Sequence, residues 1–212
     1  MAASSDLSED VPSAIDLRTM EDAREWANSA MLRRPWRQQF FDCFVAELAA
    51  SHVNSARVLK LGSGPGFLAD KILKALPDVQ YTMLDFSTAM HELARDRMGS
   101  LAQSVRSLIV DFKREGWETG LGPFDAVVTM QAVHELRHKK HAVGLHRTVR
   151  TLLNVRGCYL VCDHYVGSDG MSNNALYMTL AEHRQSLEEA GFGAVSKLLE
   201  MGGLVLHKAI IG

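Results

Sequence analysis

The spacing of hydrophobic and polar positions changes character at about residue 56. Before that point, Thr19 as N-cap with the acids Glu21 and Asp22 in the first turn predicts a helix over about 20–31. Aromatic and aliphatic residues at helical spacing predict a second helix from Trp36 to Ala50. After residue 56, short apolar runs alternate with stretches that carry helix start and stop signals. This alternation is typical of a parallel sheet with helices on both faces.

The alternating part of the chain predicts five strands, four helices and a terminal pair of strands. The strands are expected at 57–61, 80–85, 105–111, 124–130 and 157–163. The helices are expected at 66–76, 88–98, 138–153 and 172–190. The segment from Ala194 to Ile210 is expected to form an antiparallel hairpin. The predicted fold is therefore α/β, a Rossmann-like doubly wound sheet of seven mostly parallel strands with a C-terminal antiparallel hairpin and an N-terminal helical extension.

The chain of 212 residues is long enough for one domain with a proper core. Residues 1–18 are polar and acidic, which predicts a disordered tail. Residues 19–54 are expected to form a helical cap, and residues 55–212 are expected to form the main domain. Three widely spaced cysteines argue against a disulfide framework.

Charge and hydropathy narrow the expected partners. The net charge of −2 gives no reason to expect nucleic acid or an anionic membrane as a general partner. No apolar run reaches the roughly 18 residues that a membrane span needs. The acidic N-terminus lacks the order of a signal peptide, so a cytoplasmic location is expected. The oligomeric state is not readable, and a homodimer stays open.

Residues just after each strand are the candidates for a site, because ligands of such sheets bind outside the carboxyl ends of the strands. The first strand ends in the glycine-rich sequence GSGPG, which allows tight turns and close approach to a ligand. A dinucleotide fingerprint needs its last glycine at the sixth position, which is Phe67 here. The segment also lacks the Gly-Lys-Ser/Thr of a phosphate-binding loop.

Acids and an aromatic residue follow the next two strands. Asp85 can accept hydrogen bonds from both hydroxyls of a ribose, although a helix-capping or solvated role is the alternative. Asp111 and Phe112 suit an adenine, since one can accept from the exocyclic amine and the other can stack on the ring. The three strand ends together predict a pocket for an adenosyl group.

Five segments, taken in order, resemble the motifs of the class I S-adenosylmethionine-dependent methyltransferases. They are VLKLGSGPG, YTMLDFSTAM, SLIVDF, FDAVVTMQAVHEL and LLNVRGCYLVCDHY, and the resemblance covers about residues 55–210. It implies S-adenosylmethionine as cofactor and methyl transfer to an oxygen or nitrogen of a small molecule by in-line displacement. It assigns cofactor contacts to Lys60, Gly62, Ser63, Gly64, Gly66, Asp85, Phe86, Met90, Asp111, Phe112 and Gln131.

Lys60 departs from the pattern, because this family usually has an acid there that helps to hold the cofactor's amino group. A lysine cannot accept that hydrogen bond and repels the ammonium. Three outcomes are open: backbone carbonyls near Gly62 and residues such as Gln131 hold the ammonium instead, Lys60 turns away, or cofactor binding is weakened or lost. The alternative function is therefore a catalytically weak or inactive binding or scaffold protein.

Two histidines are candidates for the chemistry. His134 follows the fourth strand and His164 follows the fifth, and a histidine can act as a base near neutral pH. The alternative is that each only packs or orients the substrate. Substrate contacts are expected from Trp36, Tyr165 and Tyr177, with Tyr177 on the helix after the fifth strand, although core packing explains Tyr177 equally well.

Two further clusters have residue types that could form a site. His134, His138 and His141 are spaced to share one helical face, but the segment is strongly basic and nothing nearby completes a tetrahedral set, so no metal is expected. The basic segment 33–37, which reads RRPWR, could close over a substrate or cofactor carboxylate or form a salt-bridged helix start. Methylation of a macromolecule is a third alternative function, disfavoured because no extended basic region is evident.

Overall fold

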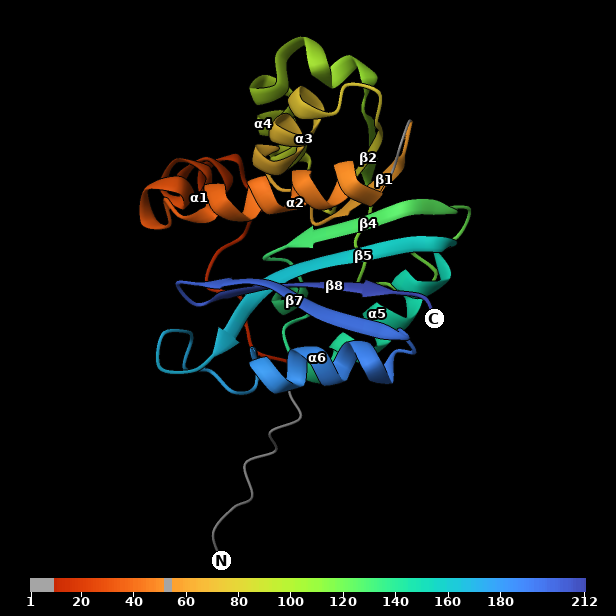
Figure 1. Ribbon diagram of the computed structural model, residues 1–212. Helices are drawn as coiled ribbons and strands as arrows, with labels where there is room; N and C mark the ends of the chain where they lie inside the picture. The colour runs from red at the N-terminus through yellow and green to blue at the C-terminus, as the bar shows by residue number, and fades with distance from the viewer. Residues whose placement is uncertain (1–9, 52–54) are drawn as a thin grey trace, which may run out of the picture.

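The computed structural model describes residues 10–51 and 55–212 (Figure 1). Residues 1–9 of the predicted tail and residues 52–54 at the end of the predicted cap lie outside the described residues. Residues 10–18 run along the main domain. The backbone N–H of Val11 donates to the carbonyl of Arg137 at 2.8 Å, and the Ser87 hydroxyl donates to the carbonyl of Leu17.

A mixed sheet forms the centre of the molecule, and the predicted α/β fold is confirmed. Its main path has the order β3-β2-β1-β4-β5-β8-β7, and the short β6 pairs with β5. The first five strands are parallel along this path, whereas β8 is antiparallel to both β5 and β7. The bounds are β1 Arg57–Leu61, β2 Gln80–Asp85, β3 Arg106–Ile109, β4 Phe124–Met130, β5 Leu153–Val166, β6 Met178–Thr179, β7 Ala194–Met201 and β8 Leu204–Ile210.

Helices cover both faces of the sheet (Figure 1). Their bounds are α1 Met20–Arg33, α2 Arg37–Ser51, α3 Phe67–Ala75, α4 Thr88–Met98, α5 Ala142–Thr151 and α6 Leu180–Glu189. Three short 3₁₀ helices connect elements: η1 Gly99–Ser104, η2 Val133–Leu136 and η3 Lys139–His141. No described helix is long and apolar enough to cross a membrane.

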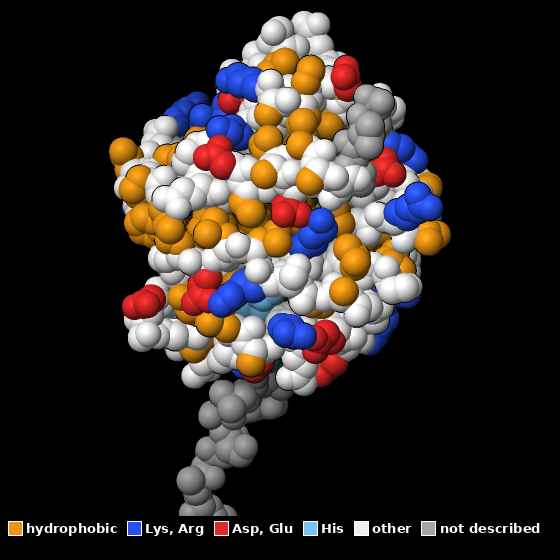
Figure 2. Space-filling model, in the orientation of Figure 1, with side chains coloured by type: hydrophobic (Ala, Val, Ile, Leu, Met, Phe, Trp, Pro, Cys, Tyr) orange, Lys and Arg blue, Asp and Glu red, His pale blue; other side chains and the backbone are white. Residues whose placement is uncertain are grey.

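Two apolar cores lie on opposite faces of the sheet. On one face, α2, α3 and α4 pack on the strands through fully buried side chains such as Phe40, Phe44 and Ile72. On the other face, α5 and α6 pack through Leu145, Val149 and Leu187 among others. Burial of each such side chain stabilises the fold by roughly 1.5 to 3 kcal/mol. On the molecular face drawn in Figure 2, Lys and Arg side chains lie next to Asp and Glu side chains at several places, between larger areas of hydrophobic and uncharged atoms.

Local signals set several helix starts at the predicted residues. Thr19 caps α1 by accepting from the N–H of Asp22, and Ser87 caps α4 by accepting from the N–H of Met90. Both interactions satisfy backbone donors that the first turn of a helix leaves free.

The prediction of a helix over 172–190 is wrong at its start. Asn173 accepts hydrogen bonds from the N–H groups of Ala175 and Leu176, which holds a turn instead of a helix. Thr179 and Glu182 then form a capping box, so α6 begins only at Leu180.

Three other predicted bounds also differ. The predicted helix 138–153 is replaced by η3 and the shorter α5, because His138 accepts from the N–H of Lys140 and holds a 3₁₀ turn. The fifth strand is longer than predicted because Leu153 already pairs with Phe124 of β4. The third strand is shorter and ends at Ile109.

Candidate active site

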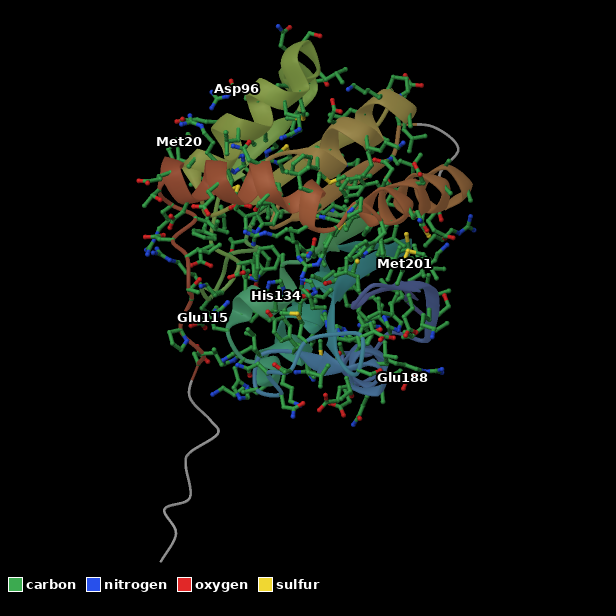
Figure 3. The ribbon with its side chains drawn as sticks, turned by 90° about the vertical axis from the view of Figure 1, so that its left-hand side faces the viewer. Met20, Asp96, Glu115, His134, Glu188 and Met201 are labelled. Atoms are coloured by element: carbon green, nitrogen blue, oxygen red, sulfur yellow. The ribbon has the colours of Figure 1, made fainter. Side chains whose placement is uncertain are left out.

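A pocket lies at the carboxyl ends of β1, β2, β4 and β5 and is covered by α1 and α2. It contains about 1150 Å³ of empty space, part of it open to solvent. In Figure 3, which views this edge of the sheet, His134 lies near the middle of the molecule below α1. The carboxyl ends of parallel strands therefore converge on one site, as the fold predicts.

The glycine-rich loop between β1 and α3 forms the floor of this pocket. Gly62, Gly64 and Gly66 all have positive φ angles, at 56°, 58° and 80°. A Cβ on Gly62 would lie 2.4 Å from the Cβ of Ala132, so only glycine lets the loop approach the end of β4. A Cβ on Gly64 would meet nothing within 4 Å.

Gly62→Ala is expected to lower the free energy of unfolding by about 2 to 4 kcal/mol, because backbone strain and a steric clash add. Gly64→Ala is the matched control. It has the same positive φ without a clash, so it should lose only about 1 kcal/mol. Urea unfolding of both variants measures the difference, and equal losses would show that contact with Ala132 does not shape the loop.

Asp85 anchors the end of the pocket formed by β2 and the loop. Its Oδ2 accepts from the N–H of Gly64 at 2.8 Å, and its Oδ1 accepts from the N–H of Ser87 at 3.0 Å. The residue is only 6% exposed. Burial raises the pKa of Asp85, although these two backbone donors oppose the rise. Because a carboxylate oxygen has two lone pairs, each oxygen keeps one acceptor site for a ligand hydroxyl.

Asp111 and Phe112 line the same end of the pocket, next to Phe86 and Met90. Phe112 is mostly buried at 8% exposure, while the Oδ1 of Asp111 accepts from the N–H of Lys113 at 3.0 Å. Asp111 thus offers a hydrogen-bond acceptor and Phe112 an aromatic ring in the same pocket as Asp85, whose carboxylate can bind ribose hydroxyls. Together these groups suit a nucleoside.

Lys60 does not turn away from the pocket. Its Nζ donates to the carbonyl oxygens of Leu61 and Gly62, both at 2.8 Å, and the side chain is buried. Burial lowers the pKa of Lys60 from 10.5 to about 7, and the charge of Asp85 limits the fall. The lysine therefore uses the carbonyl of Gly62, which the sequence suggested for a ligand ammonium.

Lys60→Met is expected to raise the free energy of unfolding by about 2 to 4 kcal/mol at pH 6. The folded pKa lies below the unfolded one, so the charged lysine destabilises the fold most below about pH 7. This destabilisation decreases as the pH rises toward 10.5. The difference in the free energy of unfolding between the variant and the wild type should decrease with it. Urea midpoints between pH 6 and 10 test this. Lys74→Met, at a 63% exposed side chain, should show no such trend.

His134 is held by two carboxylates at the end of β4. Its Nδ1 lies 2.6 Å from Oδ1 of Asp163, and its Nε2 lies 3.3 Å from Oε1 of Glu135. Asp163 also accepts the backbone N–H of His134 at 2.8 Å. Burial alone would lower the pKa of His134, but the charge and hydrogen bond of Asp163, helped by Glu135, raise it to about 10. The imidazole is therefore a cation at neutral pH.

His164 has the opposite character. Burial lowers its pKa to about 3, so the ring is neutral, and its Nε2 accepts from the side-chain amide of Gln131 at 2.8 Å. The rings of His134 and His164 meet edge to face with centroids 5.4 Å apart, and Tyr177 packs on both. In this arrangement the neutral ring of His164 orients the side chain of Gln131, and the ring of His134 carries the positive charge.

A family profile described as "Methyltransferase domain" matches residues 59–159, which include the glycine loop, Asp85, Asp111 and His134. The chain carries a methyltransferase domain.

Relatives and solved structures agree with this assignment. The malonyl-[acyl-carrier protein] O-methyltransferase of Geobacter sulfurreducens is 26% identical over 162 residues, covering 70% of this chain and 60% of the relative. The highly reducing polyketide synthase easB of Emericella nidulans is 27% identical over 166 residues, covering 66% of this chain and 6% of the synthase. The chain thus spans less than two thirds of either protein.

A solved O-methyltransferase family protein from Burkholderia thailandensis has the same fold. The TM-score is 0.72 at 18% identity, over 90% of this chain and 60% of that one.

The pocket brings together most of the residues that the sequence predicted. Those that line it are Lys60, Gly62, Ser63, Gly64, Asp85, Phe86, Met90, Asp111, Phe112, Gln131, His134 and His164. Gly66 instead shapes the loop from behind, since its Cβ would lie 2.9 Å from the Cα of Ala94. Tyr177 lies beside the pocket in the turn before β6, and not on a helix as predicted.

Trp36 and Tyr165 are not among the lining residues, although both were predicted to contact substrate. The Trp36 ring covers the β7–β8 turn, so a Cβ on Gly202 would lie 2.4 Å from it. Tyr165 packs against the loop at Gly167 and Gly170.

Several residues of the site were not singled out from the sequence, among them Arg37, Glu135 and Asp163. Arg37 lines the pocket, although the sequence drew attention to the basic segment that contains it. Asp163 holds His134, and its position directly before His164 at a strand end was the available signal.

Proposed function

We propose that this protein binds S-adenosylmethionine and transfers its methyl group to an oxygen or nitrogen of a small-molecule acceptor. The observation that carries the proposal is the arrangement along one pocket. Acceptors and an aromatic ring for a nucleoside, Asp85, Asp111 and Phe112, lie at one end, and the charged His134 lines the same pocket. When bound, the cofactor would supply an electrophilic methyl group on a sulfonium.

Unsatisfied polar atoms support a polar ligand of this size. Ser63 Oγ, Gln131 Oε1 and Arg37 Nε are buried without a hydrogen-bond partner in the described part of the chain, and all three residues line the pocket. Buried polar groups are costly when unpaired, so a ligand that pairs them gains affinity. Asp85, Asp111 and Phe112 would hold the nucleoside, and the glycine loop would pass close beneath it.

His134 favours an acceptor oxygen that reaches the site as an anion. The Nε2–H of its imidazolium lies 3.3 Å from Oε1 of Glu135 and would have to exchange that carboxylate for the acceptor oxygen in order to orient it. An anion has no proton that a base must remove. Arg33 and Arg34 also line the pocket. The named activity of the Geobacter sulfurreducens relative, O-methylation of a malonyl group, is consistent with an acidic acceptor.

Labelled methyl groups test the proposal. The protein is incubated with methyl-labelled S-adenosylmethionine and an extract of its source organism, which is then separated into small molecules, protein and RNA. Label is expected in the small-molecule fraction and absent without the enzyme. Label only in protein or RNA would contradict a small-molecule acceptor.

A non-catalytic binding protein is the second candidate, favoured by the position of Lys60 on the carbonyl of Gly62. It predicts ligand binding without transfer of label to any fraction. Lys60→Glu should then tighten the binding of S-adenosylhomocysteine strongly, whereas an active enzyme should transfer label with Lys60 in place.

A further inference from the structure

Arg37 is a buried cation without a carboxylate partner. It is 5% exposed, and in the described chain no Asp or Glu lies within ion-pair distance of it. Its guanidinium lies over the rings of Trp26, Phe41 and Phe67, at 5.3, 5.9 and 5.9 Å from their centroids. Its Nε has no hydrogen-bond partner. Such a group in a pocket wall is a recognition element for an anion.

Lys60 is a second cation in the same wall. A lysine ammonium has three donors, and two are used by the carbonyls of Leu61 and Gly62, so one remains. Arg37 is close enough for its charge to lower the pKa of Lys60. The groups whose charges act on the pKa of Lys60 are Asp85 of β2, Arg37 of α2, and Cys162 and Asp163 of β5.

Arg37 and Lys60 belong to α2 and β1, whereas Asp111 and Phe112, the residues suited to an adenine, follow β3. Asp85 lies between them, close enough for its charge to raise the pKa of Lys60. Arg37 begins α2 and stands over Phe67, the first residue of α3 directly after the glycine loop. Asp111 and Phe112 lie beyond β2, on the outer side of the sheet order β3-β2-β1. A ligand that spans the pocket from its nucleoside would therefore place its far end beside Arg37 and Lys60.

We propose that Arg37 and Lys60 form a carboxylate subsite that binds the amino-acid end of the cofactor through its carboxylate. The inference rests on the proposed function and names the part of the ligand that these residues recognise. The subsite also explains why a lysine stands where this family usually has an acid. A lysine attracts a carboxylate and repels an ammonium. The ammonium of the cofactor contributes little to affinity in this protein.

Isothermal titration with three adenosine thioethers tests the subsite. S-adenosylhomocysteine carries both carboxylate and amine, its decarboxylated analogue carries only the amine, and 5′-methylthioadenosine carries neither. The wild type is expected to bind S-adenosylhomocysteine about 10- to 100-fold more tightly than the decarboxylated analogue, the range of one charge-assisted interaction. The decarboxylated analogue should bind no more tightly than 5′-methylthioadenosine.

Arg37→Gln should remove this preference. It is expected to weaken the binding of S-adenosylhomocysteine about 10- to 100-fold and to leave the binding of 5′-methylthioadenosine unchanged. The unchanged binding would also show that the nucleoside end of the pocket is intact. Arg24→Gln is the matched control, since Arg24 is exposed on α1 outside the pocket. If Arg37→Gln binds S-adenosylhomocysteine as the wild type does, the subsite is contradicted and the proposed function stands. If the wild type binds none of the thioethers, the proposed function itself fails.

A carboxylate of the acceptor is the other source of the same chemistry. Acetate is therefore titrated into protein saturated with 5′-methylthioadenosine and into protein saturated with S-adenosylhomocysteine. Acetate should bind only the first, because the carboxylate of S-adenosylhomocysteine fills the subsite in the second. Equal binding to both forms, abolished by Arg37→Gln, would assign the subsite to the acceptor and overturn the assignment to the cofactor.

Discussion

Asp85→Ala is expected to weaken the binding of S-adenosylhomocysteine by at least about 100-fold. The variant removes a buried carboxylate whose two oxygens each keep an acceptor site for a ribose hydroxyl, and charge-assisted hydrogen bonds are among the strongest. It also removes the acceptor for the N–H of Gly64, so the glycine loop loses a fixed position. Isothermal titration of the variant gives the loss directly.

Asp85→Asn separates the two contributions. The amide oxygen can still accept from Gly64, while the charge that strengthens the ligand bonds is gone, so an intermediate loss of about 10-fold is expected. Asp96→Ala is the control, since Asp96 is an exposed acid on α4 (Figure 3). Unchanged affinity in Asp85→Ala would place the nucleoside elsewhere.

His134→Ala is expected to lower the rate of methyl transfer by about 100- to 10,000-fold. The affinity for S-adenosylhomocysteine should change less than about 3-fold, because the charge of His134 is directed to the acceptor. The rate is read as label transferred to the small-molecule product. His141→Ala, an exposed histidine paired with Asp10, should keep the wild-type rate. A large loss of ligand affinity in His134→Ala would contradict a role confined to the acceptor.

The pH profile distinguishes an imidazolium from a base at His134. With a pKa of about 10, an imidazolium that must stay charged gives a flat rate between pH 7 and 9 and a fall above pH 10. A base would give a rate that rises about tenfold per pH unit up to about pH 10. Asp163→Asn removes the charge that raises the pKa, so the fall should move to lower pH. A rising profile would establish His134 as the base.

The parts of the fold that the sequence predicts well are those with strong local signals. The apolar runs 57–61, 80–85 and 124–130 form strands with the predicted bounds, and Ser87 and Gly99 delimit α4 as expected. The segment before α6 was predicted wrongly because Ser172, Asn173 and Thr179 can each start a helix. The turn held by Asn173 decides which of them does.

The site residues that directly follow strands could be predicted from the sequence. Those whose position depends on the packing of the helical cap could be predicted less well. Trp36 and Arg37 are neighbours in sequence, yet Trp36 covers the β7–β8 turn and Arg37 lines the pocket. Which of them faces inward depends on how α1 and α2 pack on the sheet, and no local pattern encodes that. The direction of the Lys60 side chain was also not predicted, because the carbonyls that it binds belong to the next two residues of the chain, Leu61 and Gly62, and carry no sequence signal of their own.

The central claim is that this pocket binds the cofactor of the S-adenosylmethionine-dependent methyltransferases. Isothermal titration of the full chain with S-adenosylhomocysteine at neutral pH tests it most directly. We expect one ligand bound per chain with a dissociation constant in the micromolar range, and loss of that binding in Asp85→Ala. No binding at millimolar ligand would contradict it.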